Sequence, residues 1–495
     1  MSKKEKKEIQ VPKDHKLVTR RDFLSQGLIS GSGIIMAPTI LGALQMKDAY
    51  GADNCFQVAD LSNRKTPIIM IDLSGGGNIA GSNVIVGAEA GQHSYISDYG
   101  RLGLPTSMRP SNPGMVNTEM GLKFHSNSAM LEAISRNTSS TIRQKCEGAV
   151  FCAVSNDDTS NNPHNPMYWL NKAGSIGDIA QTAGTRNGRS GGRSIIPSMS
   201  YDPTIAPVAI NSPADCVQLI SLGRVHSLFD DVKAKRVLQA IQNMSESKLN
   251  SFSQKSLPEQ IREVASCGFA KENIDQRVHN NSQRYTQDAI NPDEDSDVAN
   301  VYGNLNSSSK RKEASIAKLV LDGYIGTGTI ELGGFDYHGR DTRVEQEDKD
   351  REAGDAIGRI LALAAAKQKD VMIYVYTDGG ISSNMSSVDP TNGKYVFSND
   401  DGQRGATFML AYQHNGGRPN LRHGTSGSNT VKRQIGHVKA DSNVEKSANV
   451  LSNNVTNLSK AIVANYLARH GEEDKLEEIV GDNPFGNNLN DYLIF

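Results

Sequence analysis

Hydrophobic runs divide the chain into candidate strands, each bounded by glycine or polar residues. Five runs are apolar almost throughout, at residues 67–72, 148–154, 324–332, 371–376 and 405–412. Continuous apolar runs of this length are typical of strands buried on both faces, whereas a strand with one face in water alternates apolar and polar side chains. The pattern therefore predicts a sheet that is covered on both sides.

Helical patterns lie between the candidate strands, at residues 126–142, 313–322, 343–368 and 445–469. In the third pattern, apolar residues recur at i, i+3, i+4 and i+7 behind a charged opening. Strands that alternate with helices predict an α/β fold with a mostly parallel central sheet and helices on both faces. Residues 225–290 have a polar helical pattern and residues 282–309 are hydrophilic, which predicts a helical and loop insertion at 225–310.

Polar side chains stand at the ends of these candidate strands. In a parallel sheet the carboxyl ends meet at one edge, where ligands collect, so we expect these side chains to lie close together. The residues concerned are Asn78, His164, Asp336, His338, Asp378 and either Asp400 or Asp401.

Carboxylates combined with imidazole are ligands that suit zinc or manganese, and a carboxylate-rich set also suits magnesium or calcium. Two such ions can clamp an anionic transition state and generate a hydroxide nucleophile at neutral pH. We therefore predict one or two divalent ions at this edge, with Asn78 as a neutral ligand and His164 as a ligand or a contact to a substrate anion. The predicted metal ligands are Asp336, His338, Asp378 and Asp401, with Asp400 as the alternative to the last.

Each of these residues also has a purely structural interpretation. Asp336 can cap the following helix or close an Asx turn, and His338 can be a hydrogen-bonded loop histidine. Asp378 and Asp401 both precede glycine, as in ordinary turns. The local patterns leave both interpretations open.

Two glycine-rich stretches are candidate anion contacts. Gly75, Gly76 and Gly77 follow the first strand and can cradle a phosphate on backbone N–H groups, although the stretch lacks the P-loop lysine and the dinucleotide spacing. Residues 182–193 place three arginines on a glycine-rich loop that can meet an anionic substrate or remain a solvated loop. These arginines are Arg186, Arg189 and Arg193.

The first 52 residues have the pattern of an export signal. Residues 1–21 hold eight lysines and arginines against three acids, a net charge of +5, and end in the pair Arg20-Arg21. An uncharged run at 23–46 and small residues at 49–52 follow. This resembles a twin-arginine signal, which predicts the twin-arginine translocation machinery as a partner and a periplasmic or secreted destination. The alternatives are an uncleaved anchor or a basic arm before a buried helix.

Composition limits the remaining function classes. The whole chain carries 53 basic and 55 acidic residues, so it lacks the basic excess of a nucleic-acid-binding protein. We expect membrane contact only through the signal region, and one domain at 53–495. Five cysteines show no metal-ligand spacing, and their odd number leaves at least one thiol unpaired, although an oxidising destination permits a disulfide.

The order of the motifs resembles a known family of exported proteins. LSGGGN, GLKFHSNSAMLEAI, NNPHNP, GGFDYHGRD, YVYTDGG and DDG follow one another over roughly residues 65–470. Together they resemble the secreted family called domain of unknown function 1501, of the alkaline phosphatase and sulfatase superfamily. The resemblance implies an alkaline-phosphatase-like α/β fold with two metals at the strand ends.

The family motifs map onto this chain with two departures at candidate ligands. Its GGWDTH motif preserves Asp336 and His338, and the glutamate of its SEFGR motif corresponds to Asp378. The aspartate of its GGxDG motif is replaced by Asn78, and the histidine of its DHG motif by Asp401. The first change removes a charge and the second exchanges an imidazole for a carboxylate. The alternatives for such a site are a harder metal, one ion instead of two, or no metal.

Other family residues correspond less closely. The arginine of SEFGR is replaced by Ile381, the HP turn resembles His125-Ser126, and the SHF histidine resembles His164. No nucleophile is secure, and Ser74 and Ser82 are candidates only by position.

Two functions follow from these residues. The first is an exported metal-dependent hydrolase of a phosphate or sulfate ester, or of a related small anionic substrate, with Asn78, Ser82 and His164 facing the substrate. The second is a catalytically degenerate relative with a binding or assembly role in the periplasm or at the cell surface.

Overall fold

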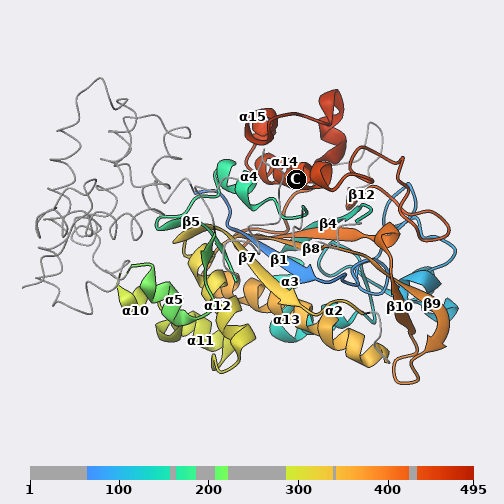
Figure 1. Ribbon diagram of the computed structural model, residues 1–495, viewed down its shortest axis with the longest axis horizontal. Coiled ribbons are helices and arrows are strands. Elements are labelled where there is room, and N and C mark those ends of the chain that lie inside the picture. The colour runs from blue at the N-terminus through green and yellow to red at the C-terminus, as the bar shows by residue number, and fades with distance from the viewer. Residues whose placement is uncertain (1–63, 156–162, 186–206, 221–285, 338–341, 423–431) are drawn as a thin grey trace, which may run out of the picture.

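The computed structural model describes residues 64–155, 163–185, 207–220, 286–337, 342–422 and 432–495. Within these residues, helices cover both faces of an eight-stranded sheet (Figure 1). The predicted α/β fold with a mostly parallel central sheet is therefore confirmed. Predictions for the signal region, His338, the three loop arginines and residues 225–285 lie outside the described residues.

The central sheet has seven strands of one direction and one of the other. In chain order they are β1 Ile68–Ser74, β4 Cys146–Cys152, β5 Ala180–Gly184, β6 Val208–Ala209, β7 Ile325–Gly333, β8 Val371–Thr377, β11 Ala406–Tyr412 and β12 Gln434–Ile435. Their spatial order is β12-β4-β11-β8-β1-β7-β5-β6, and β11 alone pairs antiparallel, with β8 and β4.

The registers bring three carboxyl ends side by side. Ser74 at the end of β1 lies opposite Gly333 of β7, and Leu73 lies opposite Thr377 of β8. Because β11 is antiparallel, its first residue, Ala406, pairs with Cys152 at the end of β4 and so lies at the same edge. The polar segments before β11 and after β1, β7 and β8 therefore share one edge of the sheet.

All five predicted strands are confirmed, with boundaries shifted by one or two residues. β4, β8 and β11 are buried along their whole length, which explains their continuous apolar runs. Sequence patterns missed β5, the short edge strands β6 and β12, and the hairpin of β9 Ile381–Val388 and β10 Tyr395–Asp400. A small hairpin pairs β2 Val116–Asn117 with β3 Phe124–His125.

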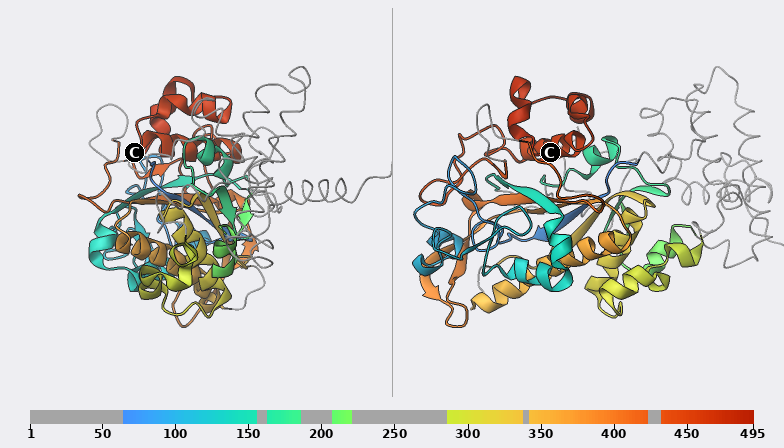
Figure 2. Two further views of the ribbon diagram at one scale, coloured as in Figure 1. Left: turned by 90° about the vertical axis from the view of Figure 1, so that its left-hand side faces the viewer. Right: turned by 180° about the vertical axis from the view of Figure 1, so that it is seen from behind.

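Two sets of helices enclose the sheet (Figures 1 and 2). On one face lie α2 Ala129–Asn137, α12 Ser308–Leu321 and α13 Arg343–Ala366, against alternate β1 side chains such as Ile69 and Ile71. The other face, with Ile68 and Met70, packs on α4 Met167–Lys172, α14 Val455–Ala468 and α15 Leu476–Val480. Each face therefore has its own hydrophobic core.

Helices α2 and α13 pack at close range because α13 has glycine at the contact. A Cβ atom on Gly354 would lie 2.1 Å from the carbonyl oxygen of Met130 in α2, well inside van der Waals contact. The glycine therefore allows the two helices to approach each other on this face of the sheet.

Several predicted helix boundaries are corrected by the structure. The pattern at 126–142 contains two helices, α2 and α3 Ser140–Gln144, because Ser139 caps a new helix after α2 ends. The pattern at 445–469 becomes helical only at Val455, where Asn454 is the N-cap. The prediction of a hydrophilic loop at 282–309 is wrong for its described part, which contains α10 Gln287–Ile290 and α11 Ser296–Tyr302.

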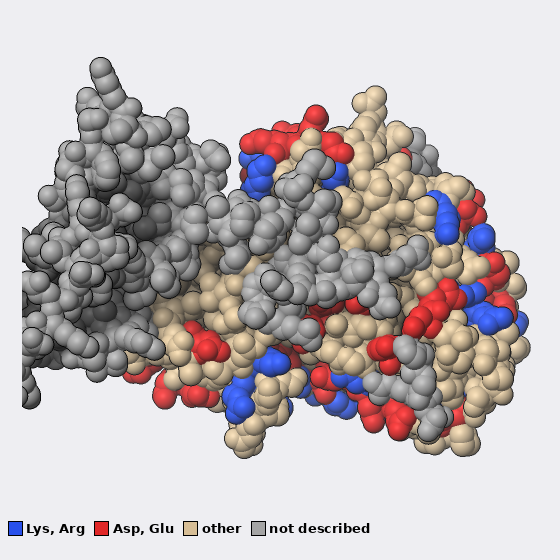
Figure 3. All heavy atoms as spheres, viewed as in Figure 1, with Lys and Arg blue, Asp and Glu red and all other residues tan. Residues whose placement is uncertain are grey.

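The shorter elements complete the described structure. They are α5 Pro213–Gln218 and the 3-10 helices η3 Gly100–Leu102, η4 Thr106–Met108, η6 Pro292–Glu294, η7 Gly402–Arg404, η8 Glu473–Lys475 and η9 Gly486–Tyr492. In the part of the chain that the structure describes, no helix is long and apolar enough to span a membrane. Charges of both signs are spread over the face in Figure 3, and acidic side chains gather over α15.

Candidate functional site

The loops after β1, β7 and β8 meet at the predicted edge of the sheet. The backbone N–H groups of Gly75 and Gly76 donate to Oδ1 of Asp378, at 2.9 and 3.1 Å. A Cβ atom on Gly75 would lie 2.9 Å from the backbone nitrogen of Asp336, so the loop after β7 touches the same glycine. The structure thus brings Asp336 and Asp378, two of the four predicted metal ligands, to one glycine loop.

These two carboxylates differ in their surroundings. Asp336 is exposed, whereas Asp378 is half-buried and has one oxygen engaged by two glycine N–H groups. His338, the ligand predicted beside Asp336, lies outside the described residues.

Asp401 is held by its own loop. Its carboxylate forms an ion pair with Arg404, and its Oδ1 accepts from the backbone N–H of Gln403 at 3.0 Å. This is how an N-cap aspartate satisfies the first turn of a short helix, here η7. The backbone N–H of Asp401 donates to the carbonyl oxygen of Gly380 at 2.8 Å, so this loop does contact the one carrying Asp378.

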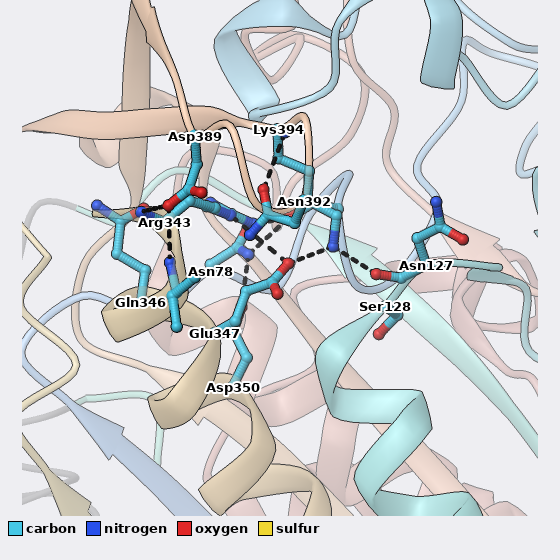
Figure 4. Close-up of polar contacts among 12 residues, drawn as sticks. Asn78, Asn127, Ser128, Arg343, Gln346, Glu347, Asp350, Asp389, Asn392 and Lys394 are labelled. Carbon is cyan, nitrogen blue, oxygen red and sulfur yellow. Dashed lines mark hydrogen bonds and ion pairs between the residues drawn. The ribbon is translucent and has the colours of Figure 1, made fainter.

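Asn78 belongs to a buried polar cluster (Figure 4), and Ser82 contacts it there. Nδ2 of Asn78 donates to Oδ2 of Asp350 at 2.9 Å and to Oγ of Ser82 at 2.6 Å. The Ser82 hydroxyl also accepts from the guanidinium of Arg343 and is fully buried. Ser82, predicted to face a substrate, is therefore enclosed by protein groups.

The cluster extends through charged residues of α13 and the β9–β10 turn (Figure 4). Lys394 forms an ion pair with Glu347, and the Asp389 carboxylate accepts from the backbone N–H of Arg343 at 2.8 Å. Burial raises the pKa of Asp350, although Arg343 and hydrogen bonds from Tyr337 and Asn78 act in the opposite direction. These members of the cluster are all nearly inaccessible to water.

Sequence reasoning missed this cluster, although the first turns of α13 contained a signal. Arg343, Gln346, Glu347 and Asp350 recur at i, i+3, i+4 and i+7, the same spacing as the apolar stripe that follows. A polar stripe in register with an apolar stripe lies on the same face of the helix, and here that face is buried.

His164 contacts Ser155, a residue that sequence reasoning missed, and Ser155 in turn contacts the loop that carries Asp378. Nε2 of His164 is 2.8 Å from Oγ of Ser155, and that hydroxyl donates to the carbonyl oxygen of Asp378 at 2.7 Å. The ring stacks on Tyr376 with centroids 6.3 Å apart. Complete burial lowers the pKa of His164 to about 3, so the imidazole is neutral at physiological pH.

An aspartate at position 78, the residue of the similar family, is expected to destabilise this chain by about 1 to 3 kcal/mol. The Asn78→Asp change would set a second carboxylate against Asp350 and remove the amide donor. In the folded state the pKa values of the new carboxylate and of Asp350 would both rise above their unfolded values. The stability contributed by these two groups is therefore present at low pH and is lost as the pH rises through the folded-state pKa values.

Urea unfolding should therefore show that Asn78→Asp lowers the free energy of unfolding more at pH 8 than at pH 5. Asn488→Asp, at an exposed position, is the matched control and should change little. A loss that is independent of pH would contradict the proposed contact between the two carboxylates.

A cavity lies at the opposite edge of the sheet. It has a volume of about 290 Å³ and is lined near the amino ends of β1, β7 and β8 by residues that include Arg64, Lys65 and Lys369. Arg64 and Lys65 already form ion pairs, with Asp178 and Glu472 respectively. The cavity is therefore separate from the predicted site, and two of the basic side chains that line it are already neutralised by ion pairs.

The three cysteines within the described residues add no ligands at the strand ends. Cys146, Cys152 and Cys216 are buried free thiols whose pKa burial raises to about 12. Cys55 and Cys267 lie outside the described residues.

The fit of a metal to this edge can be judged for the described residues only. Among them, no three His, Cys, Asp or Glu side chains are grouped so as to hold a metal ion. The carboxylate of Asp401, which was expected to face a metal, is used in internal contacts, so the described part of the predicted ligand set does not form a two-metal centre. Comparisons of the chain with family models, curated proteins and solved structures returned no match.

Proposed function

We propose that the chain is an exported protein with an alkaline-phosphatase-like fold that has lost metal-dependent hydrolysis and has a binding or assembly role in the periplasm or at the cell surface. The observation that carries this proposal is the internal use of two groups at the strand ends. The amide of Asn78 donates to Asp350 and Ser82, and the carboxylate of Asp401 pairs with Arg404.

The ion pair of Asp401 with Arg404 would have to be broken or shared before a metal could bind this carboxylate. A metal would bind the Oδ1 atom of Asn78, and the two hydrogen bonds that Nδ2 donates fix the orientation of this amide within the buried cluster. Removing one partner from such a buried group is strongly unfavourable, because a buried charge remains without compensation. The contacts of Asn78 and Asp401 thus support a role of these side chains in stabilising the fold and not in metal coordination.

The second candidate function is the metal-dependent hydrolase of a phosphate or sulfate ester. One observation favours it: Asp336 is exposed and its backbone lies against Gly75, the glycine that also contacts Asp378. These two carboxylates, with His338, would hold a zinc, manganese, magnesium or calcium ion, and the metal would supply Lewis-acid chemistry toward an anionic ester.

Metal analysis of the protein purified after twin-arginine export distinguishes the two functions. The proposal predicts no stoichiometric divalent metal, an unchanged thermal midpoint in chelator, and no hydrolysis of aryl phosphate or aryl sulfate. One ion per chain that disappears in Asp336→Asn and His338→Ala, together with hydrolysis lost in the same variants, would establish the hydrolase instead.

The control for these variants is Asp348→Asn, an exposed carboxylate on α13. It should leave metal content, thermal midpoint and hydrolysis as they are in the unaltered chain. Metal that is present in all four proteins would indicate a site elsewhere in the chain.

A further inference from the structure

The loop after β1 directs three successive backbone N–H groups toward residues 377 and 378. Gly75 and Gly76 donate to Oδ1 of Asp378, and Gly77 donates to Oγ1 of Thr377 at 2.5 Å. The φ angles of Gly75 and Gly76 are 111° and 93°, values that residues with a Cβ atom rarely adopt. The glycines therefore allow a backbone shape in which neighbouring N–H groups point the same way.

Neighbouring N–H groups that converge in this manner form a concave site for an anion. In this protein the anion is supplied by the chain itself, because a carboxylate oxygen of Asp378 lies within hydrogen-bond distance of two of the three nitrogens. Hydrogen bonds to an ionised acceptor are about twice as strong as those between neutral groups. The contact therefore links the ends of β1 and β8 through a group that resembles a bound ligand.

We propose that the N–H groups of Gly75 and Gly76 form an oxyanion-binding site for a carboxylate- or phosphate-bearing ligand, and that Asp378 keeps this site closed by occupying it. An oxyanion from solution can accept the same two hydrogen bonds only when the Asp378 carboxylate has moved away. This inference concerns anion binding and does not depend on whether hydrolysis has been lost.

The surroundings of the loop explain why the internal carboxylate would exclude a free anion. Asp378 is tethered beside the glycines, so its effective concentration far exceeds that of an ion in solution. Asp336 adds a second carboxylate next to Gly75, which disfavours a further anion while Asp378 is in place. Removal of the Asp378 carboxylate eliminates both the competitor and one of the two negative charges.

Small anions should restore what is missing in the variant Asp378→Ala. Formate matches the carboxylate that this change removes, and inorganic phosphate tests the wider class of oxyanions. We expect each to raise the thermal midpoint of Asp378→Ala by about 1 to 3 °C beyond its effect on the unaltered chain at equal ionic strength in sodium chloride. Formate should act at lower concentration than phosphate, because the second charge of phosphate meets Asp336.

Two further variants separate a site-specific effect from general salt stabilisation. Asp378→Asn retains an oxygen that can accept from the glycines, so it should respond like the unaltered chain. Asp348→Ala removes an exposed carboxylate of α13 and should also show no additional shift. If Asp378→Ala does not fold in chloride, its refolding yield should rise in formate. Equal responses of Asp378→Ala and the unaltered chain, or an absence of refolding in formate, would overturn the proposal.

Discussion

Replacing Arg343 with methionine is expected to lower the free energy of unfolding by about 3 to 5 kcal/mol. The guanidinium is fully buried, donates to Ser82 and lies 4.3 Å from the centre of the Phe397 ring. Its Nε is 3.9 Å from Oε1 of Glu347, and its charge lowers the pKa of Asp350, which burial raises. Methionine keeps an apolar stem of similar length but removes the positive charge that faces Glu347 and Asp350.

The control is Arg136→Met, which removes an arginine that also faces an acid but is exposed. Nε and Nη2 of Arg136 donate to the two oxygens of Asp355 at 2.8 and 2.5 Å, yet half of its side chain is in water. Exposed pairs of this kind contribute about 0 to 1 kcal/mol, so the control should lose much less stability. Urea unfolding followed by circular dichroism measures both changes, and similar losses would contradict the importance given to burial at Arg343.

The sheet could be predicted because its signal lies within short stretches of sequence. β8 has seven consecutive buried residues, and a strand enclosed on both faces has apolar residues at every position. Short edge strands provide no comparable signal: β6 and β12 have two residues each and are defined by backbone pairing with β5 and β4. Their existence depends on neighbours that are distant in sequence.

The meeting of polar loops at one edge also followed from sequence, because topology alone brings strand ends together. What each polar group would bond to did not follow. The partners of Asn78 are Asp350, 272 positions away, and Ser82, four positions away. The ion pair of Asp401 with Arg404 joins residues only three positions apart, so it was accessible to local reasoning. The sequence alone does not show whether an aspartate before glycine is a metal ligand or a helix cap. Its neighbours in space decide between the two.

Acid is expected to destabilise the protein as the pH falls from 6.5 to 5, because buried histidines must remain neutral in the folded state. Burial lowers the pKa of His125 to about 4 and that of His164 to about 3. Both values lie below the unfolded value near 6.5, so the unfolded chain binds more protons across this range. The stability is therefore complete above pH 6.5 and is lost as the pH falls toward the folded pKa values.

The geometry of His125 agrees with a neutral ring. Its Nδ1 accepts from the backbone N–H of Asn127 at 3.1 Å, and its Nε2 lies 2.8 Å from the carbonyl oxygen of Met108. A proton added to Nδ1 would remove the acceptor for Asn127 and place a charge where no water reaches. His470, whose pKa burial also lowers to about 4, acts in the same direction.

Each fully buried histidine should lower the free energy of unfolding by roughly 2 kcal/mol between pH 6.5 and 5, since one pKa unit corresponds to about 1.4 kcal/mol. Urea unfolding at pH 7 and pH 5 measures the difference, and His125→Gln or His164→Gln should each reduce it by about that amount. His93→Gln, at an exposed position, should leave it unchanged. Protonation of carboxylates with lowered pKa values, such as Glu119, destabilises the protein mainly below this pH range. Protonation of Asp350, whose pKa is raised, stabilises the protein as the pH falls. The loss above pH 5 therefore belongs to the histidines, and equal stability at pH 7 and pH 5 would show that they can be protonated without leaving the core.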